Sequence, residues 1–160
     1  MATLIDSCFT DAPPLAAEVA RGVTRLFCRQ DLFAICEVPL PNGRRADMMA
    51  IDGKGALTIV EIKVAKSDLL GDGKWTEYLE YCDRFFWAVP PDLASICDGE
   101  RFLPSKAGLI VADRYDAVLM RNAMHRPLAP ARRKAELLRF ARRAARRLSA
   151  QIDPSLGDDC

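Results

Sequence analysis

The sequence predicts an α/β protein built on a mixed β-sheet. Runs rich in Ile, Val, Thr and Met alternate along the chain with segments whose apolar residues recur at helical spacing. The nearly continuous apolar run at residues 84–90 is typical of a strand covered on both faces. The runs before it have the turn signals of antiparallel hairpins, so we expect both kinds of strand in one sheet flanked by helices.

The composition is that of a globular protein. The 160 residues are 50% hydrophobic and 28% charged, which allows a proper core and excludes a disordered chain. No apolar run approaches the ~20 residues needed to span a bilayer, and the first residues lack the pattern of a secretion signal. We therefore expect a cytoplasmic protein without membrane contact, whose six cysteines are reduced thiols.

The first half of the chain predicts one helix and three strands. The helix is indicated by apolar residues at helical spacing, namely Leu15, Val19, Val23 and Leu26. A short strand follows at residues 33–39, and Pro41, Asn42 and Gly43 form a strong turn signal. Two further runs, residues 46–51 and 57–64, flank a turn at residues 53–55 and predict a β-hairpin.

The second half predicts further helices and strands. Residues 65–73 are polar and turn-rich, and a helix is expected at 74–82 with three inward side chains, Trp75, Leu79 and Cys82. The remaining elements are the strand at 84–90, a short helix at 92–96, strands at 108–113 and 117–121, and a basic helix at 130–150. Residues 1–150 are thus expected to form a single domain, followed by an acidic flexible tail at 151–160.

The hairpin brings two acidic residues and a lysine together. If its strands pair symmetrically about Lys54, Asp47 lies opposite Glu61, with Cβ atoms about 4.5–5.5 Å apart. Lys63 shares the face of Glu61, because side chains alternate along a strand. A register slip of one residue would move Asp47 to the other face.

Two carboxylates in a low-dielectric position repel each other, and a divalent cation removes that repulsion. Mg²⁺ takes one or two carboxylates and completes its coordination with water and phosphate oxygens. Lys63 would then orient an attacking water or stabilise charge on a phosphate. The alternative is a pair of surface charges on an edge strand, with Glu61 bridged to Lys63.

Asp47, a spacer of thirteen residues and then Glu61, Ile62 and Lys63 resemble the D…(D/E)-x-K core of the PD-(D/E)XK nuclease superfamily. The longer string from residue 45 to residue 90 resembles the MmcB-like family of bacterial DNA-repair proteins within it. The resemblance covers about residues 15–128, and it departs from the pattern where Ala46 replaces a proline. It implies a restriction-endonuclease-like core (αβββαβ) and a Mg²⁺- or Mn²⁺-dependent DNA endonuclease acting in DNA repair or damage tolerance.

Two more acids are candidates for the metal site. The resemblance implies that Glu18, on the first helix, completes the metal shell, whereas the alternative is an exposed helix glutamate. A three-residue turn at 41–43 would place Glu37 opposite Asp47, and a two-residue turn would shift it by one position.

Three residues are candidates for contact with substrate. Lys74 matches the lysine of the family string and is expected near phosphate, and the alternative is a solvated lysine at a helix start. Tyr81 lies on the same predicted helix face as Lys74. Arg45 either reaches substrate phosphate or neutralises the acidic residues.

Charge is unevenly distributed although the net charge is only +1. Residues 126–150 hold nine Lys and Arg residues against Glu136 alone. The helix at 130–150 has an apolar docking stripe of Leu137, Phe140, Ala141, Ala144 and Leu148. Arginines cover much of the rest, and Arg139, Arg143 and Arg146 are expected to hold DNA phosphate. A solvated face, a partner-docking helix and a membrane-surface helix are the alternatives, the last lacking a bulky apolar face.

Two functions follow from these observations. The first is a metal-dependent DNA nuclease that uses Asp47, Glu61 and Lys63. The second is a non-catalytic DNA-binding or adaptor protein on the same scaffold, with DNA and DNA-repair proteins as partners. The sequence leaves the oligomeric state open.

Overall fold

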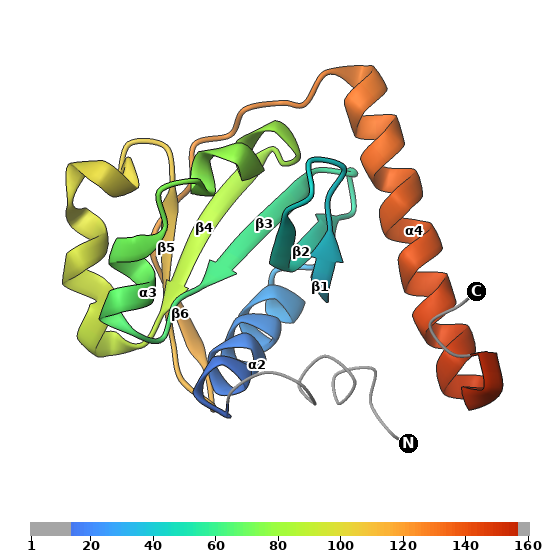
Figure 1. Cartoon of the computed structure of the whole chain (residues 1–160), viewed down its shortest axis with the longest axis horizontal. Helices are drawn as coiled ribbons and strands as arrows, with labels where there is room; N and C mark the ends of the chain where they lie inside the picture. The colour runs from blue at the N-terminus through green and yellow to red at the C-terminus, as the bar shows by residue number, and fades with distance from the viewer. Residues whose placement is uncertain (1–13, 157–160) are drawn as a thin grey trace.

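The computed structural model describes residues 14–156, which form one six-stranded β-sheet with helical layers on both faces (Figure 1). The helices in chain order, with η marking a 3₁₀-helix, are α2 (Pro14–Arg29), α3 (Lys66–Gly71), η1 (Trp75–Glu80), η2 (Pro91–Asp98), η3 (Glu100–Phe102), α4 (Pro130–Ile152) and η4 (Pro154–Leu156). Within this range no helix combines the length and apolar character needed to cross a bilayer.

The strands follow one another across the sheet in chain order, from β1 at one edge to β6 at the other. They are β1 (Leu32–Pro39), β2 (Arg45–Asp52), β3 (Leu57–Ile62), β4 (Arg84–Val89), β5 (Gly108–Ala112) and β6 (Ala117–Arg121). The first three are antiparallel neighbours, β3, β4 and β5 are parallel, and β6 is antiparallel to β5. The predicted mixed α/β sheet is confirmed, while a restriction-endonuclease-like core stays a prediction.

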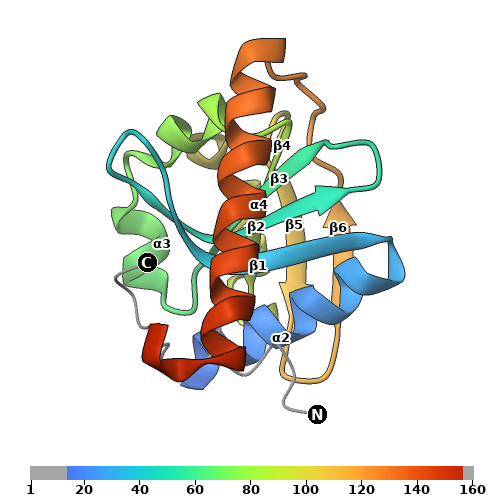
Figure 2. The same ribbon diagram turned by 90° about the vertical axis from the view of Figure 1, so that its right-hand side faces the viewer.

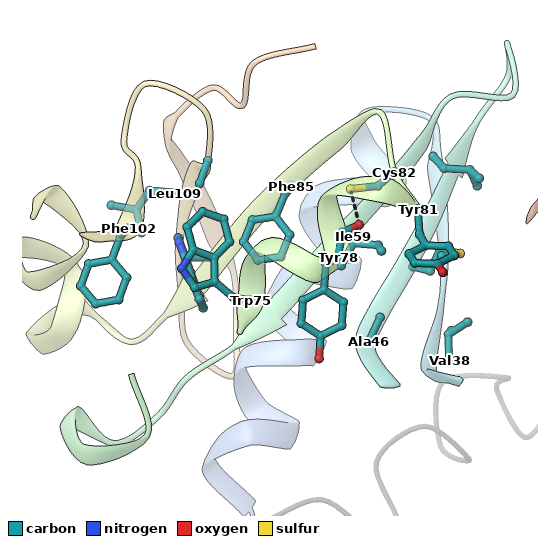
Figure 3. Packing of buried hydrophobic residues seen from close by; sticks show 14 of the residues in the cluster. Val38, Ala46, Ile59, Trp75, Tyr78, Tyr81, Cys82, Phe85, Phe102 and Leu109 are labelled. Atoms are coloured by element: carbon teal, nitrogen blue, oxygen red, sulfur yellow. Dashed lines mark hydrogen bonds between the residues drawn. The ribbon is translucent and has the colours of Figure 1, made fainter. Parts of the chain in front are cut away.

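The core has two layers, one on each face of the sheet. Helix α2 packs on one face through Val19 and Val23, which contact side chains such as Phe86. The other face carries an aromatic cluster that includes Trp75 and Phe85 (Figure 3). The ring centroid of Trp75 lies 5.1 Å from that of Phe85 and 5.1 Å from that of Trp87. β4 therefore has apolar side chains on both faces, as its continuous apolar run predicts.

The segment between β3 and β4 that was predicted to be an α-helix forms a different type of helix. Instead of an α-helix at 74–82, the chain forms the 3₁₀-helix η1, in which side chains three apart share a face. Trp75, Tyr78 and Tyr81 are accordingly all buried. Trp75 and Cys82 of the predicted inward stripe are buried and Leu79 packs half-buried against the core, but the period of 3.6 wrongly leaves Tyr81 outside.

Two other segments are more ordered than predicted. The polar stretch 65–73 contains α3, because Leu69 is fully buried and anchors a short helix. Residues 151–152 belong to α4 and residues 154–156 form η4, so part of the predicted flexible tail is helical. The rest of that tail, residues 157–160, lies outside the described residues.

Helix α4 lies across the β1 edge of the sheet (Figure 2). Phe140 is buried in the core and Leu137 packs against it, but Leu148 and Ala141 of the predicted docking stripe are exposed. Polar side chains of α4 make the remaining contacts with the body of the protein. Glu136 is buried, and Arg133 and Arg147 bond to the sheet's edge and loops.

Candidate functional site

The register of the β2–β3 hairpin is the predicted one. Met48 pairs with Val60 and Ile51 pairs with Leu57, which continues to a pairing of Asp47 with Glu61. The Asp47 N–H donates to Glu61 Oε1 (3.1 Å) and the Ile62 N–H donates to Asp47 Oδ2 (2.7 Å). Each carboxylate therefore reaches the backbone of the neighbouring strand, and the two acids lie side by side.

Both carboxylates of this pair are shielded from water. Glu61 is only 3% exposed and Asp47 is half-buried. Burial, followed by the charge of Asp47, raises the pKa of Glu61 to about 8 in spite of the bond from the Asp47 N–H. Burial likewise raises the pKa of Asp47. The negative charge of the pair is therefore incompletely compensated when both groups are ionised, which is the condition that a cation relieves.

Lys63 lies directly beyond this pair, at the end of β3. Its Nζ is 3.0 Å from Asp72 Oδ2 and 3.9 Å from Glu61 Oε2. Burial alone lowers the pKa of Lys63, but the bond to Asp72 and the charges of Asp72, Glu61 and Asp47 outweigh it, so the pKa is raised and the side chain stays an ammonium. Asp72 is a residue that sequence reasoning missed, because it lies in a loop where no periodicity operates.

Glu37 occupies the position that the three-residue turn predicts. The turn is closed by a bond from the Leu40 N–H to the Arg44 oxygen (2.7 Å), and the β1–β2 register places Glu37 level with Asp47. Glu37 has a left-handed backbone with φ +52°, which is rare for a residue other than glycine. Its charge contributes to the raised pKa of Asp47. Glu37 thus borders the acidic pair.

Two of the three candidate substrate-binding residues, Arg45 and Lys74, are exposed, whereas Tyr81 is buried. Arg45 is exposed and its Nε lies 2.6 Å from Glu37 Oε2. Lys74 is exposed beside the site, and its N–H donates to Asp72 Oδ1 (3.2 Å).

Tyr81 does not share the exposed face of Lys74, which corrects the helix-based prediction. Its ring is buried, with the Arg132 guanidinium 4.7 Å from the ring centroid. Tyr78 borders the acidic pair, because the 3₁₀ repeat turns it toward β2. The Tyr78 hydroxyl donates to the Arg45 carbonyl oxygen (3.1 Å), and burial together with the charges of Glu61 and Asp47 raises its pKa.

Glu18 is not brought to the acidic pair. Helix α2 packs on the other face of the sheet, against the β5–β6 turn, and a Cβ at Gly22 would overlap the Asp113 carbonyl oxygen. From there the Glu18 carboxylate lies 3.6 Å from Arg114 Nε. The prediction that Glu18 completes the metal shell is therefore not supported by its position.

The arginines of α4 fall into two sets. An inner set contacts the body of the protein and consists of Arg132, Arg133 and Arg147. An outer set lines a surface hollow with Ala145 and consists of Arg139, Arg142, Arg143 and Arg146. Within it, burial and the charges of Arg147 and Arg146 lower the pKa of Arg143, as expected where positive charge is incompletely compensated. Arg139 is the exception, since its Nη1 lies 2.5 Å from Glu136 Oε1.

No ready-made cage of three or more His, Cys, Asp or Glu side chains is present among residues 14–156. The adjacent carboxylates of Asp47 and Glu61 still match what Mg²⁺ takes from proteins, which is one or two carboxylates with the remaining positions left to water and phosphate. The two carboxylates therefore fit a hard divalent cation whose remaining ligands come from outside this pair.

Taken together, the fold and site define a mixed-sheet α/β protein that carries a buried carboxylate pair and an ammonium where a central strand ends. The chain matches the model of the DNA repair protein MmcB-like family over residues 6–155 and belongs to that family. It is similar to the SPO1766 protein of unknown function from Silicibacter pomeroyi, with 41% identity, a TM-score of 0.80, and coverage of 91% of this chain and 95% of that one. No curated protein is similar enough to count as a relative.

Proposed function

We propose that this protein is a metal-dependent DNA nuclease that hydrolyses phosphodiester bonds in DNA repair. The observation that carries the proposal is the convergence of Asp47, Glu61 and Lys63 at the end of β3. Membership of a DNA-repair family supports DNA as the substrate. The outer arginines of α4 and the exposed side chains of Arg45 and Lys74 supply positive charge for the phosphate backbone.

The chain's own residues would perform distinct tasks. The carboxylates of Asp47 and Glu61 would hold Mg²⁺ or Mn²⁺, which when bound polarises a phosphate and lowers the pKa of a water molecule. Lys63 is an ammonium and therefore a hydrogen-bond donor, so it is suited to orient the attacking water or to stabilise negative charge on the phosphate. Burial of Glu61 keeps bulk water away from one side of the site.

Cleavage assays test this proposal. Single-stranded, duplex and branched DNA are incubated with Mg²⁺, with Mn²⁺ and with chelator, using the whole chain and the variants Asp47→Asn, Glu61→Gln and Lys63→Met. We expect metal-dependent cleavage that each variant lowers by about 10²-fold or more. Glu80→Gln is the matched control, because Glu80 is an exposed glutamate at the end of η1. Activity that survives in the Asp47 or Lys63 variant defeats the assignment.

A second candidate is a non-catalytic DNA-binding or adaptor protein on the same scaffold. It is favoured by the absence of a three-residue metal cage in the described part of the chain and by the arginine-lined hollow on α4. Calorimetric titration with Mn²⁺ separates the two candidates. Metal binding that disappears in Glu61→Gln supports the enzyme, whereas salt-sensitive DNA binding without metal binding supports the adaptor.

A further inference from the structure

The tetrapeptide formed by Gly71, Asp72, Gly73 and Lys74 lacks the spacing of a phosphate-binding loop, yet it lies against the candidate site. We infer that Asp72 is a positioning residue of this site, which holds the Lys63 ammonium beside Glu61. The catalytic part of this inference rests on the proposed nuclease function, whereas the anchoring of Lys63 can be measured without it.

The geometry makes Asp72 the principal partner of the Lys63 ammonium. The Nζ of Lys63 lies 3.0 Å from Asp72 Oδ2, within hydrogen-bond range, but 3.9 Å from Glu61 Oε2, which is beyond it. Of the two Glu61 oxygens, Oε1 accepts the Asp47 N–H, and Oε2 is the one that faces Lys63 without reaching hydrogen-bond distance. Without Asp72, nothing in the described contacts would bond this ammonium at close range.

The ion pair is not an ordinary surface contact. The side chains of Lys63 and Asp72 are 16% and 15% exposed, so water screens them only weakly. A lysine side chain is long and flexible, and a free one would sample many positions. A fixed carboxylate partner restricts it to the position next to Glu61.

Asp72 is itself held from both sides along the chain. Before it, Leu69 is fully buried and the Leu70 carbonyl accepts a bond from Arg101 Nη2 (2.5 Å). After it, Trp75 is buried in the aromatic cluster. Its own Oδ1 accepts the Lys74 N–H, which leaves Oδ2 to face Lys63. The loop therefore presents one carboxylate oxygen to the lysine in a defined direction.

Asp72→Asn is the sharpest test, because the amide oxygen can still accept the Lys74 N–H while the amide nitrogen cannot accept from Lys63. Asp68→Asn is the matched control, since Asp68 is an exposed aspartate on α3 in the same segment. The first readout is the ¹H–¹⁵N NMR signal of the Lys63 ammonium, assigned by its loss in Lys63→Met. A hydrogen-bonded, sheltered ammonium gives such a signal, whereas a freely exchanging one does not.

We expect the Lys63 signal in the whole chain and in Asp68→Asn, its loss in Asp72→Asn, and its partial recovery in Asp72→Glu. On a DNA substrate that the whole chain cleaves, Asp72→Asn should lower kcat by about 10²-fold with KM unchanged, because a misplaced group costs about that much. Asp68→Asn should change neither constant.

The inference is overturned if the Lys63 signal is absent from the whole chain or persists in Asp72→Asn. It is also overturned if an active enzyme keeps its kcat in Asp72→Asn. If no DNA is cleaved under any condition, the proposed nuclease function fails, and the NMR comparison alone then decides whether Asp72 anchors Lys63.

Discussion

Replacing Arg133 with alanine tests the contact that ties α4 to the sheet. The Arg133 guanidinium donates to both carboxylate oxygens of Asp83, with Nη1 2.9 Å from Oδ2, and also to the Gly55 carbonyl oxygen (2.8 Å). The Asp83 side chain is 0% exposed and accepts two further bonds from the N–H groups of Leu57 and Leu128. The carboxylate is thus a junction between β3, β4 and the segment leading into α4.

The magnitude follows from the burial of the two partners. Removing one partner of a buried ion pair costs about 3–5 kcal/mol. Arg133 is 26% exposed, and the two backbone donors to Asp83 remain in place, so we expect a loss at or below the lower end, about 2–3 kcal/mol. At about 3 °C per kcal/mol for a chain of this size, the midpoint of thermal unfolding should fall by roughly 6–9 °C.

Calorimetry and urea unfolding measure this loss. We expect a lower urea midpoint with an unchanged slope in Arg133→Ala, because the folded state remains as compact as before. Arg142→Ala is the control, since Arg142 is exposed on the outer face of the same helix and should change stability by about 0.5 kcal/mol or less. A loss below about 1 kcal/mol in Arg133→Ala would refute the role of Asp83 as a junction.

The same contact predicts a dependence on pH. Burial alone raises the pKa of Asp83, but the bonds from Arg133, Leu57 and Leu128 outweigh it, and the net pKa lies below the ordinary 3.8. Because the pKa of Asp83 is lower in the folded protein than in the unfolded chain, its ionised form stabilises the fold at pH values above 3.8. This stabilisation is lost as the pH falls through the pKa of the folded state. The difference between the whole chain and Arg133→Ala should therefore be full at pH 7 and should shrink below about pH 4.

Three further predictions concern the site and its surroundings. Because the pKa of Glu61 is raised to about 8, the stability that its protonated form contributes is lost as the pH rises from about 4.5 to 8. Glu61→Gln should therefore raise the thermal midpoint at pH 9 more than at pH 4. Equal shifts at the two pH values would contradict the raised pKa. At the left-handed position of Glu37, glycine should be more stable than alanine by about 1 kcal/mol in urea unfolding, and the reverse order would contradict the positive φ. Alanine at both Arg142 and Arg143 should reduce the slope of log affinity for duplex DNA against log salt by about 2, whereas Lys134→Ala, on a different surface of α4, should leave it unchanged.

The hairpin and its acidic pair were predictable because local rules determine them. A short turn at Gly53, Lys54 and Gly55 fixes the register, and the alternation of strand side chains then decides which residues share a face. The same reasoning identified Glu37 as one of two alternatives, since the length of the turn at 41–43 decides its position. Sequence patterns of this kind need no knowledge of distant segments.

The remaining features depend on tertiary contacts or on helix type. Tyr78 and Tyr81 are both buried because a 3₁₀-helix repeats every three residues, and the sequence pattern was interpreted with the period of an α-helix. Asp72 meets Lys63 only because the chain folds back after α3. Glu18 was misplaced because its helix stripe gives no information about which face of the sheet that helix covers.

The inner arginines of α4 have a consequence for experiments that shorten the chain. Arg133 bonds Asp83 near the start of the helix, and Arg147, about four turns further along it, donates to the carbonyls of Cys36 and Glu37. A protein cut before Pro130 would lose both attachments at once. The Asp83 carboxylate would lose the Arg133 guanidinium while keeping the N–H donors of Leu57 and Leu128, and the carbonyls of Cys36 and Glu37 would lose their bonds from Arg147. If such a fragment bound DNA weakly, the cause could equally be a destabilised sheet or the loss of the basic surface. Point substitutions on the outer face of α4 separate these two effects.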